Sequence, residues 1–169
     1  VVTPGARHIT GPTSHEAPCG PRFAAQSVRV TLFCLSVTGF AQDRKVEQAI
    51  KHRRAAFTLM STYFSRLLQT VEGDRPFDPR QVAADAKTVE ALSHLPWEGF
   101  AHGTERGDTR AKEDIWLEEE RFKKRQKELQ GQAADLSRAA ESGHLARLNA
   151  EFLLTREICN GCHQDFRHR

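Results

Sequence analysis

Long apolar segments are missing from this sequence of 169 residues. No stretch reaches the roughly 18 to 20 consecutive apolar residues with which a helix crosses a bilayer. Charge of one sign is also scarce, because 25 Lys and Arg stand against 22 Asp and Glu. A net charge of +3 provides no basic footprint for nucleic acid. We therefore expect neither a membrane anchor nor a nucleic-acid partner.

Residues that alternate between apolar and polar, the pattern of a half-buried strand, are absent after Gln42. The same region contains four segments with helical spacing, at about 45–72, 79–94, 112–141 and 144–167. Mostly short connections between them favour antiparallel neighbours. The predicted fold class is all-α, an antiparallel up-down four-helix bundle. A solenoid of helical pairs is the alternative, but the pairs share no repeated motif.

Apolar residues recur every three or four positions in each predicted helix, which defines a buried face. The second helix begins with Asp78 as a plausible N-cap and Pro79 in the first turn. A glycine-rich loop through 99–107 separates it from the third helix. The buried faces are Val46, Ile50, Arg53, Phe57, Met60, Phe64, Leu67 and Val71; Val82, Ala86, Val89 and Leu92; Ile115, Phe122, Leu129 and Leu136; and Leu145, Leu148, Phe152, Thr155, Cys159, Cys162 and Phe166.

A short apolar stretch, 30–41, follows Arg29 and ends with the small residues Gly39 and Ala41. This layout is typical of a secretory signal peptide, which we expect to be cut before Gln42. The alternative is a buried strand or a short helix. We divide the chain into an N-terminal extension with a signal peptide, 1–41, which is removed, and a helical bundle, 42–169. Export of this kind predicts a periplasmic protein.

The four cysteines do not form an evenly spaced disulfide framework. Two of them lie in Cys159-Asn160-Gly161-Cys162-His163, which is the attachment pattern of haem c. Residues three apart on a helix share a face, so both sulfurs can form thioether bonds to one haem. His163 follows immediately and is predicted to be the proximal ligand of the iron. The sequence therefore predicts one covalent haem c per chain.

Other uses of a Cys-x-x-Cys pair fit this sequence less well. A thioredoxin-like motif needs a strand before the helix, and half a zinc site needs a second Cys or His pair. The remaining histidines are scattered. No pair of carboxylates or nucleophile with its base accompanies the predicted haem, so we do not expect an enzyme. A bundle without a cofactor would leave the Cys159 to His163 run unexplained.

The residue opposite the sixth position of the iron decides the function. Phe57 over the iron would leave it five-coordinate and high-spin, whereas Met60 as a ligand would make it six-coordinate and low-spin. Packing in the core is the alternative for both side chains. Arg53 on a buried face is costly unless a haem propionate pairs with it, or unless its head reaches water. Arg167 lies one helical turn after His163, either near the haem or as a solvated C-terminal cation.

With these residues in place, the chain resembles the cytochrome c prime family, the class II c-type cytochromes of bacteria, over residues 46–167. The resemblance rests on the C-terminal Cys-x-x-Cys-His run followed by Phe166 and Arg167, and on an Arg-containing first helix. Further similar segments are Leu95-Pro96-Trp97, Gly103-Thr104-Glu105 and Ile115-Trp116. His52 and Arg54 depart from a common Tyr and a common Gln.

This resemblance implies a left-handed four-helix bundle, often a homodimer through its first two helices. It implies His163 as the sole strong axial ligand, with Phe57 at a distal position that is often Leu. Arg53 would contact a propionate, and Arg167 would lie beside the proximal histidine. Members bind nitric oxide, some bind carbon monoxide, and electron transfer to an unidentified redox partner is also implied. The alternative is a low-spin electron-transfer cytochrome with Met60 as the sixth ligand; a peroxidase would need a distal His or Arg.

Overall fold

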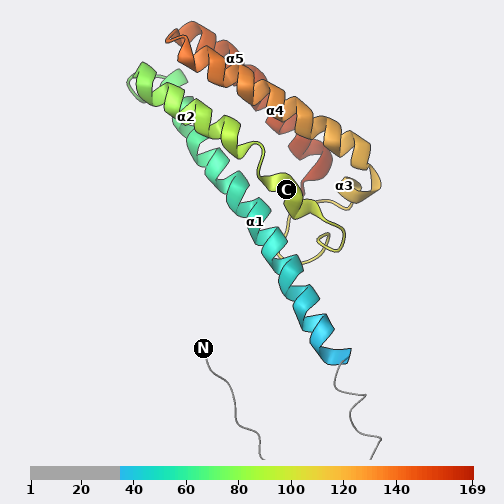
Figure 1. The fold of residues 1–169 in the computed structure, drawn as a ribbon. Coiled ribbons are helices and arrows are strands. Elements are labelled where there is room, and N and C mark those ends of the chain that lie inside the picture. Colours follow the sequence, from blue (N-terminus) through green and yellow to red (C-terminus); the bar gives the residue numbers. More distant parts are fainter. Residues whose placement is uncertain (1–34) are drawn as a thin grey trace, which may run out of the picture. The chain divides into compact units, whose positions relative to one another are not determined.

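The computed structural model describes residues 35–169, with side chains from Gln42 onward, and this part of the chain is helical (Figure 1). Most of the predicted N-terminal extension and signal peptide lies outside the described residues. The elements are α1 (Leu35–Val71), α2 (Pro79–Leu92), the 3₁₀ helix η1 (Pro96–Phe100), α3 (Asp114–Leu117), α4 (Glu119–Glu141) and α5 (Leu145–Phe166).

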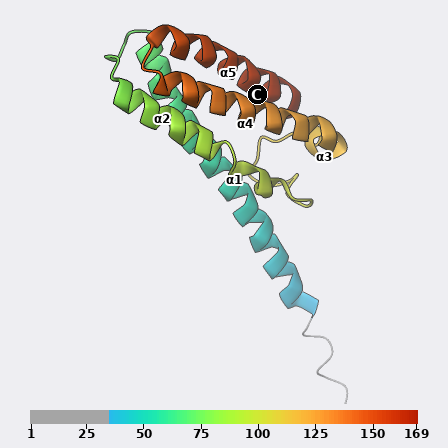
Figure 2. The ribbon, with the colours of Figure 1, turned by 45° about the horizontal axis from the view of Figure 1, so that its top comes forward.

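The four long helices pack as an up-down bundle, which confirms the predicted fold. Consecutive long helices run in opposite directions, and α5 returns antiparallel to α1 (Figures 1 and 2). Pairs α1–α2, α2–α4 and α4–α5 have extensive interfaces, whereas α1 and α5 touch at few places. Of the neighbouring long helices, α1 and α5 therefore make the least mutual contact, and the sequence predicts the haem between these two helices.

Helix α1 begins at Leu35, about ten residues before the predicted start near Lys45. The prediction of that start was wrong because helix propagation adds one hydrogen bond per residue, and a lone Gly39 does not stop it. The N-terminal part of α1 extends beyond the other helices (Figure 1). Signal cleavage before Gln42 stays a prediction.

Helix α2 has the predicted N-terminal signals. The Asp78 carboxylate accepts hydrogen bonds from the backbone N–H groups of Arg80 (2.9 Å) and Gln81 (3.4 Å), and Pro79 lies in the first turn. This cap satisfies donors that the helix itself leaves without partners. The following loop contains η1, a short 3₁₀ helix that we had not predicted.

The predicted continuous third helix, 112–141, is interrupted at Glu118, whose backbone departs from helical geometry (φ −117°, ψ 46°). Local periodicity gave no sign of this break, because tertiary packing causes it. Ile115 is buried in the short α3, and the indole N–H of Trp116 donates to the carbonyl of Phe100 at 3.0 Å. Glu119 and Glu120 then occupy the first turn of α4, where acidic side chains favour a helix start.

The predicted buried faces line the core, except that the prediction for Leu145 was wrong: in the first turn of α5 this side chain is 41 % exposed. One cluster joins α1, α2, α4 and α5 along most of the bundle, and a smaller aromatic cluster lies at the end that carries α3 and η1. The larger cluster consists of Met60, Leu67, Val82, Ala86, Val89, Leu92, Leu129, Ala133, Leu136, Ala140, Leu148 and Phe152. The smaller one consists of Ile115, Phe122 and Phe166 with Trp97, Phe100, Ala111, Trp116 and Cys162 around them.

Within residues 35–169, none of the helices is both long and apolar enough to span a membrane. The same residues form no strand, and one isolated antiparallel bridge joins Ala111 to Arg167.

Two leucines of α1 provide a matched test of this core. Leu67 is fully buried (0 % exposed), whereas Leu59 on the same helix is 51 % exposed. We expect Leu67→Ala to lower the free energy of unfolding by about 2 to 5 kcal/mol, because it removes buried methyl groups and leaves a cavity. Leu59→Ala should cost less than about 1 kcal/mol. Chemical denaturation measures both, and equal losses would contradict the arrangement.

Candidate haem-binding site

The last two turns of α5 carry the predicted attachment residues. Cys159 and Cys162 are free thiols, half-buried, and each borders a different core cluster. Burial raises the pKa of each thiol to about 11. The two cysteines therefore point into the bundle as neutral thiols, on the side where α5 faces its neighbours.

His163 differs from the two cysteines because it keeps contact with solvent. Partial desolvation, and to a lesser degree the charge of Arg167, lowers the pKa of its imidazole. A lowered pKa favours the neutral imidazole, which is the form that binds a metal ion. Two thiols and a neutral imidazole within one and a half turns form a donor set that fits a covalently attached haem.

The register between α1 and α5 places Phe57 opposite the attachment turns. The rings of Phe64 and Phe152 stack across the two helices with centroids 4.4 Å apart. The helices are antiparallel, so moving two turns toward the start of α1 and two turns toward the end of α5 reaches the same level. These steps lead to Phe57 and Cys159, which both pack against the larger core cluster.

Aromatic rings surround Phe57 on the other side. Its ring meets Trp97 edge-on at 5.9 Å and Phe100 at 6.3 Å. Trp97 in turn lies 5.6 Å from Phe122, which lies 5.3 Å from Phe166 on α5. This end of the bundle therefore has an apolar, aromatic wall suited to a porphyrin. Met60 is buried in the larger core cluster one turn away.

Arg53 is 2 % exposed, so its guanidinium group does not reach water. Its Nη1 donates to the carbonyl of Gly99 (2.7 Å) and to Thr104 Oγ1 (2.8 Å). Its Nη2 donates to the carbonyl of Thr104 and to Thr109 Oγ1, both at 2.8 Å. Burial lowers the pKa of Arg53 to about 10, which still leaves it charged at neutral pH.

The guanidinium of Arg53 has no carboxylate within ion-pair distance in the described part of the chain. All four of its hydrogen bonds go to neutral oxygens, one to the carbonyl of Gly99 in η1 and three to Thr104 and Thr109 in the loop between η1 and α3. A buried cation without a counter-ion suits a nearby propionate, while the structure shows that the side chain also organises the loop. The propionate contact stays a prediction.

Gly99 allows that loop to approach α1, a role that its place in a glycine-rich loop did not reveal. A Cβ at position 99 would lie 2.7 Å from the carbonyl of Ala49 and 2.8 Å from Arg53 Cβ. Such distances are too short for any side chain, so η1 can pack this closely against α1 only with glycine at this position.

Arg167 terminates α5, and its backbone N–H donates to the carbonyl of His163 at 3.2 Å. Its side chain is exposed, yet its charge contributes to the lowered pKa of His163. The guanidinium therefore acts electrostatically on the predicted proximal ligand. Sequence reasoning missed a further group near this turn, formed by Asp165, Arg121, Arg125 and Lys112, because Asp165 is 40 to 53 residues from the other three along the chain.

A four-helix bundle with the attachment turn on its last helix and an aromatic wall opposite is the architecture of a class of haem c proteins. The family model described as Cytochrome C' matches residues 48–167. A curated cytochrome c' of Alcaligenes xylosoxydans xylosoxydans is 38% identical over 128 residues, covering 76% of this chain and 99% of that protein. One from Rubrivivax gelatinosus is 33% identical over 129 residues, covering 76% of this chain and all (100%) of that protein.

Solved structures agree with these relatives. Cytochrome c prime from Shewanella frigidimarina superimposes with a TM-score of 0.71 at 34% identity, covering 73% of this chain and 97% of that one. A nitric oxide complex of a variant of cytochrome c prime from Alcaligenes xylosoxidans gives 0.70 at 37% identity, covering 73% and 96%. The chain belongs to the cytochrome c' family, whose members carry covalently bound haem c.

Variants of the two neighbouring arginines of α1, Arg53 and Arg54, test whether the hydrogen bonds of Arg53 organise the loop after η1. We expect Arg53→Met to lower the free energy of unfolding by at least about 2 kcal/mol, because it leaves several buried oxygens without donors. Arg54 is exposed and pairs with Asp108, so Arg54→Met should cost less than about 1 kcal/mol. Thermal and chemical unfolding of both variants measures the difference. Similar losses would show that the contacts of Arg53 do not organise the loop.

The two thiols are tested by mass spectrometry of the denatured chain. After expression with a haem c maturation system, the wild-type chain should keep the mass of one haem. The double variant Cys159→Ser with Cys162→Ser should lose it, because a hydroxyl at these positions forms no thioether. Haem that stays bound to the double variant through denaturation would contradict the attachment.

Proposed function

We propose that this chain is a periplasmic haem c protein with a high-spin, five-coordinate iron that binds nitric oxide and other small diatomic gases, and that also passes electrons. We further propose that it is not a dedicated enzyme. The observation that carries this proposal is the position of Phe57, level with Cys159 across the α1–α5 face. When bound, the haem supplies an iron that coordinates diatomic gases and carries one electron.

Phe57 supports gas binding selected by size. Its ring carries no hydrogen-bond donor, and the rings of Trp97 and Phe100 hold it edge-on from the side of η1. An apolar side chain at the distal position admits small ligands and gives a polar bound oxygen no partner. Nitric oxide complexes of relatives from Alcaligenes xylosoxidans agree with this ligand class.

The polar residues of α1 near Phe57 have partners elsewhere. The terminal N–H groups of Arg53 donate to Gly99 in η1 and to Thr104 and Thr109 in the loop after it. The His52 ring lies 2.8 Å from the carbonyl of Leu95. A peroxidase needs a distal His or Arg free to move the protons of peroxide. The engagement of these two residues favours ligand binding over that chemistry.

Met60 supports five-coordination by its burial. It is 8 % exposed and belongs to the larger core cluster, where a flexible thioether fills space among leucines and alanines. Ligation by Met60 would require it to leave that cluster. The low-spin electron carrier therefore remains the second candidate function, favoured by the single methionine that lies one turn from Phe57.

Location and assembly are parts of the same proposal. The signal-like stretch 30–41 supports export to the periplasm, where bacteria attach haem c. Association of two chains through α1 and α2, and the redox partner, are expected from the family and stay predictions.

Variants of two phenylalanines of α1 test whether Phe57 covers the sixth position of the iron and so acts as a lid. We expect ferrous haem-loaded protein to bind nitric oxide and carbon monoxide at one site per chain. Phe57→Ala should speed carbon monoxide association by about tenfold or more, which corresponds to about 1.4 kcal/mol of barrier. Stopped-flow absorption measures the rate.

Phe64→Ala is the matched control, because Phe64 lies on the same helix but stacks on Phe152 two turns away. Its association rate should stay within about twofold of the wild type. Equal rates in the wild type and both variants would show that Phe57 is not the lid. Failure of the wild-type protein to bind either gas would overturn the proposed function itself.

A further inference from the structure

The carboxylate of Asp165, two residues after His163, joins the end of α5 to α4. Its Oδ1 accepts from Arg121 Nη2 at 2.7 Å. Its Oδ2 accepts from Arg125 Nε at 3.1 Å and from Arg125 Nη2 at 2.9 Å. The Asp165 side chain is 18 % exposed, and its bond to Arg125 is the largest cause that raises the pKa of that guanidinium. Two arginines thus share one half-buried carboxylate through three charge-assisted hydrogen bonds.

Arg125 also lies against the attachment turn. A Cβ at Gly161, between the two cysteines, would come within 3.7 Å of Arg125 Nη2. The same guanidinium therefore lies beside the Cys-x-x-Cys turn and binds the carboxylate two residues after His163. The ion pair between Asp165 and Arg125 therefore lies beside the residues that are predicted to hold the haem.

Lys112 makes further hydrogen bonds to the same turn. Its ammonium donates to the carbonyls of Gln164 (2.8 Å) and Asp165 (3.0 Å), and its backbone N–H donates to the carbonyl of Phe166 at 3.0 Å. These carbonyls belong to the last turn of α5, where a helix leaves acceptors without partners. Contacts from α4 and from the segment before α3 therefore hold the backbone immediately after His163.

The His163 ring itself has no hydrogen bond or ion pair to another residue in the described part of the chain. A metal-binding histidine usually donates its second N–H to a carboxylate or carbonyl, which fixes the orientation of its ring. Here no such protein group is in place. Among the described residues, the protein therefore acts on the position of the imidazole through the backbone turn that carries it.

We propose that Asp165 is a positioning residue for His163: its bonds to Arg121 and Arg125 hold the last turn of α5 so that the imidazole meets the iron in one orientation. This inference rests on the proposed function in one respect, that His163 is the iron ligand. Asp165 acts through His163 and does not touch the haem in this role.

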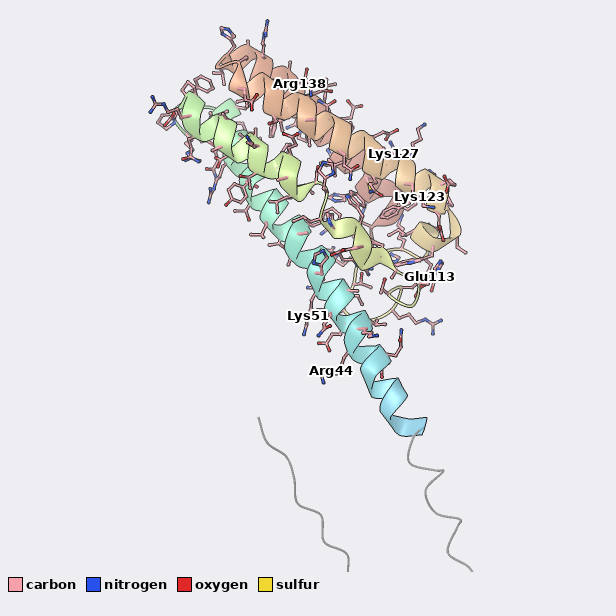
Figure 3. The ribbon with its side chains drawn as sticks, viewed as in Figure 1. Arg44, Lys51, Glu113, Lys123, Lys127 and Arg138 are labelled. Carbon is pink, nitrogen blue, oxygen red and sulfur yellow. The ribbon has the colours of Figure 1, made fainter. Side chains whose placement is uncertain are left out.

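The test compares two Asp→Asn variants of the haem-loaded protein. Asp165→Asn and Asp135→Asn each remove one negative charge, and each weakens an ion pair that involves α4. The Asp135–Arg138 pair is exposed, and Arg138 lies on the half of α4 far from Lys123 (Figure 3). The readouts are the iron–histidine stretching band of the ferrous protein, by resonance Raman spectroscopy, and hydrogen exchange of the Arg167 amide, whose acceptor is the carbonyl of His163.

In Asp165→Asn we expect a shifted or broadened iron–histidine band and amide exchange about tenfold faster, because charge-assisted bonds to the turn are lost. Asp135→Asn should match the wild type in both. An unchanged iron–histidine band in Asp165→Asn would overturn the inference, whether or not amide exchange is faster. Ion pairs that only stabilise the fold would leave this band unchanged.

A second pair covers the case in which Asp165→Asn does not accumulate. Arg125→Gln leaves the Arg121 bond in place and should alter the band in the same direction, whereas Arg138→Gln should not. An unchanged band in Arg125→Gln would then overturn the inference. Absence of any iron–histidine band in the wild-type protein would instead contradict His163 as the ligand, which is a failure of the proposed function.

Discussion

The groups predicted to bind the haem lie within five consecutive residues of a single helix. Cys159, Cys162 and His163 occupy the last two turns of α5, so in this account one helix provides both thioether links and the axial ligand. Every other element can therefore contribute only walls, charges and support. The placement of the end of α5 is the constraint from which the rest of the site follows, and α4, α3 and the segment before α3 all make contacts there.

The opposite wall follows from helix register. Phe64 and Phe152 stack between α1 and α5, and two turns further along the antiparallel pair Phe57 comes level with Cys159. Phe57 lies at the end of the bundle where aromatic rings replace aliphatic ones. Arg53 holds η1 and the loop after it with four hydrogen bonds, and Gly99 lets η1 approach α1 closely. The aromatic rings of α1, η1 and α4 therefore form one wall of the predicted site, and the helix that carries His163 forms the other.

Much of this could be predicted from the sequence because its signals are local. Period and capping residues predicted the four long helices, and the spacing of Cys159, Cys162 and His163 predicted the cofactor. The break at Glu118, the 3₁₀ helix η1 and the early start at Leu35 had no such signal, because packing or helix propagation decides them. Arg53 shows the limit of local signals. Its place on the buried face of the first helix could be predicted, but its hydrogen-bond partners lie 46 to 56 residues away along the chain. The ion pairs of Asp165 with Arg121 and Arg125 could not be predicted for the same reason.

The central claim is that His163 is the one strong protein ligand of the iron, with the sixth position facing Phe57 left open. The most direct measurement is the electron paramagnetic resonance spectrum of the purified ferric protein at neutral pH. The account predicts a high-spin signal that is the same in the wild type and in Met60→Leu. A low-spin signal in the wild type that Met60→Leu converts to high spin would contradict it, and would assign the sixth position to Met60.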